Sequence, residues 1–523
     1  MHQINSSKPN TVSYRFNIFI VKHATLISVI LLGYFIWWWV YKIDLLPGLH
    51  ADEAWFGLEA IKIKKTGVTS LTGMTAYTGI LQQLINAVSF RIFGIGVIQL
   101  RITTVFFNLV GLGIIYQVLY SVRRVSSVVL LLMLAQSVLF ITASRIAWEV
   151  NTFHLFFFSI SFLSIMRMIR EGEQRTVWQH AFLIANMLGA YNHIIFSSLV
   201  LSLFLGLLFY TTVSKDRAYM RIIFLCICSI FNTAILLCAF KYIPNVIGKA
   251  DPLMLLGCMI ILITYQVRII QNMELKRLVL KTTALKYFVA SFGMFGLLLF
   301  LIHHGLAFFQ FISNLKTFES IYGLAPNALF EFSYSICAIV FIIYLLDSLF
   351  RHLKKRSILS PFASVVIFYF VVFTFYTTAN SLRYYILIYF LCTTYLSLEV
   401  GKLRRVHYPL LLTVLTMILM NSYLLIRIYS RSKDQVAAVT VSIGNNQKEN
   451  SGHFLPNKPL IDFLKENKVS KIKTITNDYF IQLPVTFYEQ ASPWNKVENN
   501  HAVIDYNSNP NSNGFDMVLV KLP

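Results

Sequence analysis

The sequence predicts an all-α polytopic membrane protein with a small C-terminal α/β domain outside the membrane. Of its 523 residues, 56% are hydrophobic and only 13% are charged, a composition that excludes an ordinary soluble domain. Apolar runs of about twenty residues, the length that crosses a bilayer, recur between residues 19 and 429. Beyond residue 429 the chain becomes polar and rich in asparagine, lysine and proline.

The basic residues lie in short clusters between the apolar runs. The net charge of +22 would suggest nucleic acid in a soluble protein, but this distribution is typical of cytoplasmic membrane loops. We therefore expect no nucleic-acid partner. The six cysteines lie in apolar runs, and their spacing indicates neither a zinc site nor a disulfide framework.

Residues 1–18 are polar and form the predicted cytoplasmic tail of a membrane domain that covers residues 19–429. The first apolar run, Phe19–Tyr41, is too long for a signal peptide and should remain as a span. It delivers residues 42–98, the first outer loop, to the opposite side. The loop contains two expected interfacial elements, an amphipathic helix over 53–66 and an apolar but glutamine-containing segment over 78–96.

With these two elements left out, we expect about thirteen membrane spans. With that number, every dense basic cluster falls on the inner side, whereas a full crossing by residues 78–96 would switch the later clusters to the outside. An odd number of spans also places residues 430–523 outside. There the pattern predicts a helix over Leu460–Glu466, strands over Val469–Thr476 and Met517–Leu522, and a disordered neck near 442–452.

The stretch Leu46–Trp55 is the predicted chemical centre. It places Asp52 and Glu53 side by side just past the first membrane exit, where a pair of acids favours a functional role because acids are costly in hydrocarbon. The alternative is that both acids only solvate the first turn of a surface helix. Glu149 comes next, at the start of a span on the same side, with a salt bridge to Arg145 at i−4 as its alternative role.

Other outer boundaries carry groups suited to a ligand. Arg383 precedes Tyr384 and Tyr385, and a guanidinium beside phenolic hydroxyls suits a phosphate, with interfacial anchoring as the alternative. His193 has the chemistry of a metal ligand or hydrogen-bonding group, although a lone histidine is more often structural. The same choice applies to the pair His303–His304.

The order of these motifs resembles the GT-C superfamily of polytopic glycosyltransferases, closest to the branch of protein O-mannosyltransferases, aminoarabinose transferases and lipid A-core galacturonosyltransferases. The resemblance begins with the acidic pair in Leu49–Ala54, continues from Tyr77 through Phe93-Gly94 to Arg101, and ends with Leu382–Leu387. It covers most of residues 20–430 and is strongest over 46–115. The chain departs from the family at Thr75-Ala76, ahead of Tyr77, where relatives usually have proline.

This resemblance implies an enzyme that moves a sugar from a polyprenyl phosphate carrier to a lipid, glycan or protein acceptor. The reaction would occur on the outer face of a bacterial inner membrane. Asp52 would be the general base, and Glu53 would orient it. A divalent metal ion held by Glu53 or His193 is a further option, and Glu149 is a third expected catalytic acid. The expected substrate-binding residues are Arg383, Tyr384, Arg145, Tyr77 and His193.

Two other classes of protein fit the composition. A transporter or flippase of lipid-linked sugars would use acids as an ion relay, which predicts ionisable groups near mid-membrane. The expected spans are almost free of acids at their centres, and this favours an enzyme that works at the rim. A sensor or structural protein that works through its polar tail is the third reading. The sequence indicates neither the sugar, for which aminoarabinose and mannose both fit, nor the acceptor.

Overall fold

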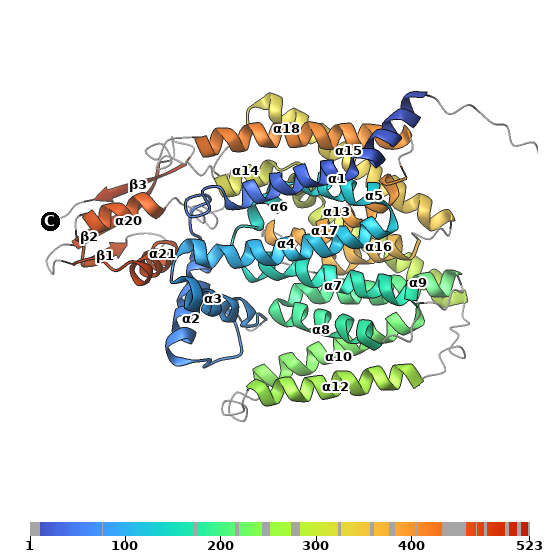
Figure 1. Ribbon diagram of the computed structural model, residues 1–523, viewed down its shortest axis with the longest axis horizontal. Coiled ribbons are helices and arrows are strands. Elements are labelled where there is room, and N and C mark those ends of the chain that lie inside the picture. The colour runs from blue at the N-terminus through green and yellow to red at the C-terminus, as the bar shows by residue number, and fades with distance from the viewer. Residues whose placement is uncertain are drawn as a thin grey trace, which may run out of the picture.

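The computed structural model shows a bundle of long helices with a small domain at one end (Figure 1). It describes residues 11–75, 77–171, 176–214, 219–242, 252–272, 283–322, 326–355, 360–375, 382–402, 405–430, 457–466, 468–474, 478–496, 501–509 and 514–520. The predicted neck near 442–452 lies outside these residues.

The bundle consists of helices that run roughly along the longest axis of the molecule (Figure 1). They are α1 (Thr11–Val40), α4 (Val97–Val122), α5 (Arg124–Ala135), α7 (Glu149–Glu171), α8 (Thr176–Asn192), α9 (Ser197–Ser214), α10 (Met220–Tyr242), α12 (Pro252–Asn272), α13 (Thr283–Ile312), α15 (Ala328–Lys355), α16 (Ser360–Thr374), α17 (Tyr385–Val400) and α18 (Tyr408–Ser430). Short helices α6 (Val138–Ala143), α14 (Leu315–Tyr322), η1 (Ile194–Phe196), η3 (Leu382–Tyr384) and η4 (Arg405–His407) join them.

Among the described residues, six helices are long and apolar enough to cross a membrane, and further apolar helices are shorter. This confirms the predicted class, an all-α multi-pass integral membrane protein. The number of crossings, about thirteen by the charge rule, stays a prediction.

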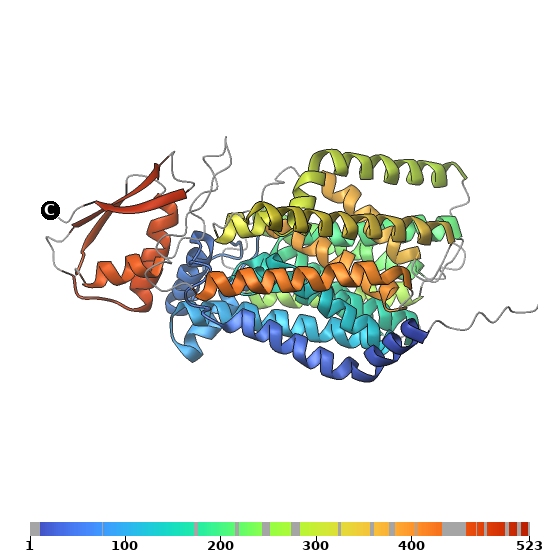
Figure 2. The ribbon, with the colours of Figure 1, turned by 90° about the horizontal axis from the view of Figure 1, so that it is seen from above.

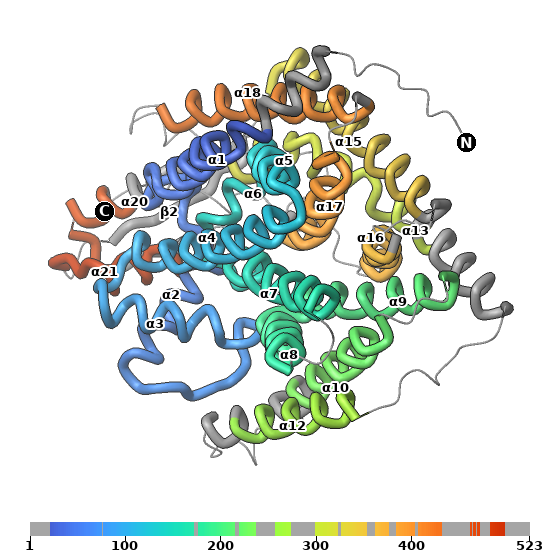
Figure 3. The backbone as a smooth tube through the Cα atoms, turned by 45° about the vertical axis from the view of Figure 1, so that its right-hand side comes forward, coloured from blue at the N-terminus to red at the C-terminus, as the bar shows by residue number. Residues whose placement is uncertain are grey.

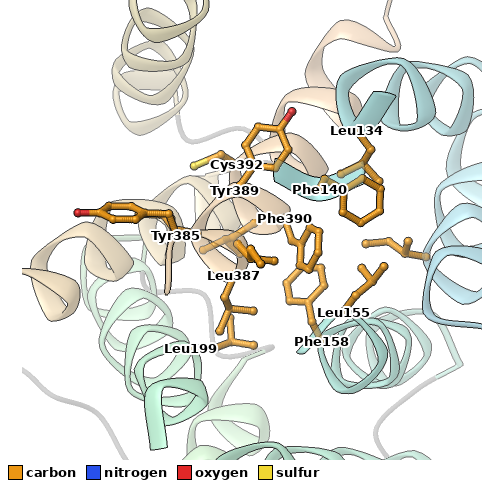
Figure 4. Close-up of a cluster of buried hydrophobic side chains, with 14 of the residues drawn as sticks. Leu134, Phe140, Leu155, Phe158, Leu199, Tyr385, Leu387, Tyr389, Phe390 and Cys392 are labelled. Carbon is orange, nitrogen blue, oxygen red and sulfur yellow. The ribbon is translucent and has the colours of Figure 1, made fainter. Parts of the chain in front are cut away.

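Helix α17 lies at the centre of the bundle, among α5, α7, α15 and α16 (Figure 3). It is apolar around its whole circumference, and every one of its residues is buried, as expected for a helix surrounded on all sides. Figure 4 shows Leu387 and Phe390 of this helix among Phe140, Phe158 and Leu199 of neighbouring helices. The packing of α17 fixes the position of η3, which immediately precedes it.

The first outer loop forms α2 (Ala51–Thr66) and α3 (Leu81–Phe93), beside the C-terminal domain at what we call the domain end of the bundle (Figure 1). The N-cap of α2 is His50, whose Nδ1 accepts the backbone N–H of Asp52 at 2.9 Å. The backbone N–H of His50 donates to Glu53 Oε2 at 3.2 Å, which completes a capping box. The expected helix over 53–66 is therefore present as α2, and the expected interfacial segment over 78–96 contains α3. The location of both in a membrane interface stays a prediction.

The C-terminal domain combines two helices with one small sheet (Figure 2). Its elements are α20 (Asn457–Glu466), β1 (Lys471–Thr474), α21 (Asp478–Ala491), β2 (His501–Asn509) and β3 (Gly514–Val520). The sheet order is β1-β2-β3, with β1 parallel and β3 antiparallel to β2. The sequence pattern indicated α20, β1 and β3 but neither β2 nor α21, whose internal Pro484 is unusual in a helix.

Candidate active site

Asp52 and Arg383 form an ion pair at the domain end of the bundle. The first turn of α2 carries Asp52, and η3 carries Arg383; Asp52 Oδ2 lies 3.2 Å from Arg383 Nη1. The side chains are 15% and 20% exposed, so the pair is largely buried but still accessible. The Arg383 guanidinium also stacks on Trp148, 4.9 Å from its ring centre, and lies 5.3 Å from that of Tyr384.

Negative charge around Arg383 keeps it protonated. Burial alone would lower its pKa, but the charge of Glu149, the neighbouring Tyr384 and the charge of Asp52 together raise the pKa of Arg383 above its usual value. The guanidinium is therefore a permanent cation that is paired with Asp52 and influenced by the nearby Glu149. Such a group can bind a phosphate or balance an anion that forms during a reaction.

Glu149 and His193 lie next to this ion pair. Glu149 begins α7, and its Oε1 is 3.9 Å from His193 Nε2. Its other oxygen, Oε2, is buried and accepts no hydrogen bond from any residue that the structure describes. His193 Nδ1 accepts the backbone N–H of Ile195 at 3.2 Å, which places the ring proton on Nε2, toward Glu149. Burial, with His154 and Arg383 nearby, lowers the pKa of His193 well below its usual value, so the ring is neutral.

Two tyrosines flank His193. The ring centres of Tyr77 and Tyr384 lie 5.4 Å and 5.5 Å from that of His193. The loop that carries Tyr77 is joined to the end of α8, because Ile194 N–H donates to the Tyr77 carbonyl at 3.2 Å. Tyr77 is 40% exposed, whereas His193 is buried, so Tyr77 lies at the solvent side of the cluster.

Glu53 occupies a separate, fully buried ion pair with Arg101. Nε and Nη2 of Arg101 donate to the two carboxylate oxygens at 2.9 and 2.7 Å, and the Ala147 N–H donates to Oε1 at 2.8 Å. Arg101 also donates to the carbonyls of Ile43, Pro47 and Gly48. This geometry corrects the expectation that Glu53 orients Asp52 or holds a metal ion, because both of its oxygens already bind donors. Its partner Arg101 was part of the sequence motif, but no sequence signal linked the two.

Arg145 is also fully buried and lies among helix ends. Its Nη1 donates to the Trp38 carbonyl at 2.6 Å and to the Tyr429 hydroxyl at 2.7 Å, and Nη2 donates to the Tyr41 carbonyl at 2.8 Å. Helix α7 begins only at Glu149, so the i−4 helical spacing assumed for a salt bridge with Arg145 does not apply. The structure therefore corrects both sequence expectations for Arg145: its contacts tie α1 to α18, and no ion pair with Glu149 forms.

Two residues beside the site were not identified from the sequence. The His50 ring lies edge-on to Trp148, with 4.7 Å between centres, and His50 Nδ1 is 3.8 Å from Asp52 Oδ2. Histidine is not a favoured N-cap residue, so the pattern gave no warning of this role. Trp148 directly precedes Glu149, and only the fold shows that its ring lies beneath Arg383.

His304, of the predicted pair His303–His304, belongs to another helix, α13. His304 is buried in α13, with Nδ1 3.4 Å from the Tyr385 hydroxyl. Within the described ranges, no group of three or more His, Cys, Asp and Glu side chains has the arrangement of a metal site.

An apolar cavity of about 170 Å³ is lined by Phe158, Ile169 and Leu203 among others. Its lining residues on α7 extend toward Glu171, the end opposite Glu149, so the cavity is separate from the polar site.

Comparison with known proteins finds similarity in architecture. The sequence matches no protein-family model and no curated protein. The structure is similar to a crystal structure of ArnT from Cupriavidus metallidurans bound to undecaprenyl phosphate, with 13% identity over 92% of this chain and 93% of that chain, and a TM-score of 0.38. It is also similar to a crystal structure of the Archaeoglobus fulgidus oligosaccharyltransferase in complex with Zn and sulfate, with 13% identity over 93% of this chain and 68% of that chain, and a TM-score of 0.46.

The likeness agrees with the predicted resemblance in architecture alone. At these identities and TM-scores the likeness carries no argument about function.

Proposed function

We propose that the protein transfers one sugar from a polyprenyl phosphate carrier to a hydroxyl or similar group of a lipid, glycan or protein acceptor, on the outer face of a bacterial inner membrane. The pairing of Asp52 with Arg383 supports this proposal most directly. It places a proton acceptor beside a permanent cation at one end of an apolar bundle. A donor with a lipid tail and a phosphate needs both an apolar environment and a cation.

In the proposed reaction Asp52 is the general base and Arg383 is the phosphate clamp. The acceptor oxygen attacks the anomeric carbon while Asp52 takes the acceptor proton. The bond between that carbon and the phosphate oxygen breaks, and polyprenyl phosphate leaves with the bonding electrons. No strong acid is required, because the leaving group is already an anion whose charge Arg383 balances. When the donor phosphate binds Arg383, Asp52 loses part of its ion pair and becomes a better base.

Glu149 and His193 are proposed to bind the transferred sugar. The unpartnered Oε2 of Glu149 can accept a hydrogen bond from a sugar hydroxyl, which would satisfy a buried group that now has no donor. The neutral His193 carries its proton on Nε2 and can donate to a second sugar oxygen. Tyr77 and Tyr384, on either side of this ring, would contact the sugar or the phosphate.

The test is a transfer assay with purified protein and radiolabelled polyprenyl phosphate sugars of the aminoarabinose and mannose types. We expect release of polyprenyl phosphate and label on an acceptor from membrane extracts, with at least about a hundredfold loss in Asp52→Asn. Donor consumption that is absent, or unchanged in Asp52→Asn, would contradict the proposal. Movement of an intact donor across reconstituted vesicles without cleavage would instead support a flippase.

A further inference from the structure

Helix α21 of the C-terminal domain packs directly across α2, the helix that carries Asp52. The contact is an apolar cluster that is separate from the main core of the bundle. Its buried members include Ala54, Ala60 and Ile61 of α2, Phe90 of α3 and Phe487 of α21. Outside this cluster, Lys65 Nζ donates to Gln490 Oε1 at 3.3 Å.

Gly57 of α2 lies directly against the ring of Phe487. A Cβ atom added to Gly57 would lie 2.3 Å from Cε2 and 2.7 Å from Cδ2 of Phe487, so no larger residue fits while the ring stays in place. Phe487 is fully buried, and its ring centre lies 6.1 Å from that of Phe90. Glycine inside a helix costs about 1 kcal/mol relative to alanine. Here the missing side chain of Gly57 leaves the space that the Phe487 ring fills, and we call this space the Gly57 notch.

Tyr488, the residue after Phe487 in α21, lies near the Arg101–Glu53 ion pair that holds the first turn of α2. Burial raises the pKa of Tyr488 to about 12, although Arg101 acts in the opposite direction, and Glu53 also contributes. Tyr488 is therefore within electrostatic range of the Arg101–Glu53 pair, which holds the chain that enters α2. Helix α21 thus packs against the middle of α2 and lies within electrostatic range of the ion pair at its start. Because Gly57 is five residues after Asp52, the two are only about 8 Å apart along the helix axis.

We propose that the C-terminal domain positions the catalytic base: Phe487 in the Gly57 notch sets the tilt of α2 and thereby the separation of Asp52 from Arg383. This inference rests on the proposed transferase function. In this arrangement Gly57 and Phe487 are positioning residues, since neither contacts the ion pair. A small rotation of α2 about the notch moves Asp52, and a misplacement of about 1 Å in a catalytic group can cost up to a hundredfold in rate.

The test uses full-length protein with single and compensating substitutions at the notch. Gly57→Ala introduces a methyl group against the ring, and Phe487→Ala removes the ring without a clash. We expect each to lower kcat about tenfold with less than about a twofold change in donor KM. The double variant Gly57→Ala with Phe487→Leu should recover most of the lost turnover, because the smaller side chain leaves room for the methyl group. Gly113→Ala on α4, where an added Cβ meets nothing within 4 Å, is the matched control and should retain wild-type activity.

Hydrogen exchange of the α2 amides gives a second measurement that does not depend on activity. Exchange should rise in Gly57→Ala and Phe487→Ala, and return toward wild type in the double variant. If wild-type protein transfers no sugar, the proposed function fails, while the exchange pattern still tests whether the notch holds α2. Wild-type turnover in both single variants would overturn the inference, as would reduced turnover with unchanged exchange and no recovery in the double variant.

Discussion

Asp52 and Arg383 are 331 residues apart in the sequence, yet Oδ2 of one lies 3.2 Å from Nη1 of the other. Asp52 is held by α2, which lies at the end of the bundle, and Arg383 by η3 at the start of the buried helix α17. The pair therefore joins a loop helix, which the C-terminal domain contacts, to the rigid centre of the bundle.

Asp52→Asn should abolish transfer while the protein stays folded. The amide cannot accept the acceptor proton, and loss of a general base lowers rate by about 10² to 10⁴. Turnover and the thermal unfolding temperature would be measured together. The control is Asp347→Asn, at a half-exposed carboxylate that pairs with Arg351 at 2.9 Å and lies outside the site. Turnover near wild type in Asp52→Asn would contradict the assignment of the base.

Arg383→Gln should lower kcat by about 10² to 10³, because the developing phosphate charge would lose its balancing cation. The kcat of Arg383→Lys should lie between those of wild type and Arg383→Gln, since lysine keeps the charge but loses the planar pair of donors. Donor KM should rise in both variants. Arg427→Gln, at an exposed position in the last turn of α18, serves as the control. Equal activity of the glutamine and lysine variants would show that charge at this position is not used.

Glu53→Gln should act on stability. It leaves the Arg101 guanidinium buried without its counter-charge, and breaking such a pair costs about 3–5 kcal/mol. The free energy of unfolding, measured in detergent by chemical denaturation, should fall accordingly. Glu59→Gln on the same helix is the matched control, because its pair with Lys62 is solvent-exposed and worth at most about 1 kcal/mol. A Glu53→Gln protein as stable as Glu59→Gln would contradict this reading of the buried pair.

His193 should contribute a loss of stability at acid pH. Burial, with His154 and Arg383, lowers its pKa in the folded protein, whereas the unfolded chain binds a proton near the usual value of about 6.5. At this residue the unfolded state therefore binds more protons as pH drops below about 6.5, so His193 lowers the free energy of unfolding there but not above. His193→Gln should weaken this slope in unfolding curves recorded from about pH 5 to pH 8. Identical slopes in the two proteins would show that His193 is not the source.

The membrane class, the loop helices and the rim location of the acids follow from local sequence properties. Apolar runs of sufficient length must be buried in lipid or protein, and charge is excluded from them wherever they lie. Asp52, Glu149, Arg383 and His193 could therefore be selected as candidates before any contact was known. Fewer elements could be predicted in the polar C-terminal domain. Pro484 argued against a helix where α21 lies, and β2 had no clear alternating pattern.

Only the tertiary structure decided which acid pairs with which cation. Asp52 and Glu53 are adjacent in sequence, but side chains at i and i+1 point about 100° apart around a helix. Asp52 therefore reaches Arg383, whereas Glu53 reaches Arg101, which is 48 residues further along the chain. Arg145 lies only four residues before Glu149 but is bound to the ends of α1 and α18 instead. These pairings depend on how helices distant in the chain pack together, and that packing cannot be predicted from local composition and spacing.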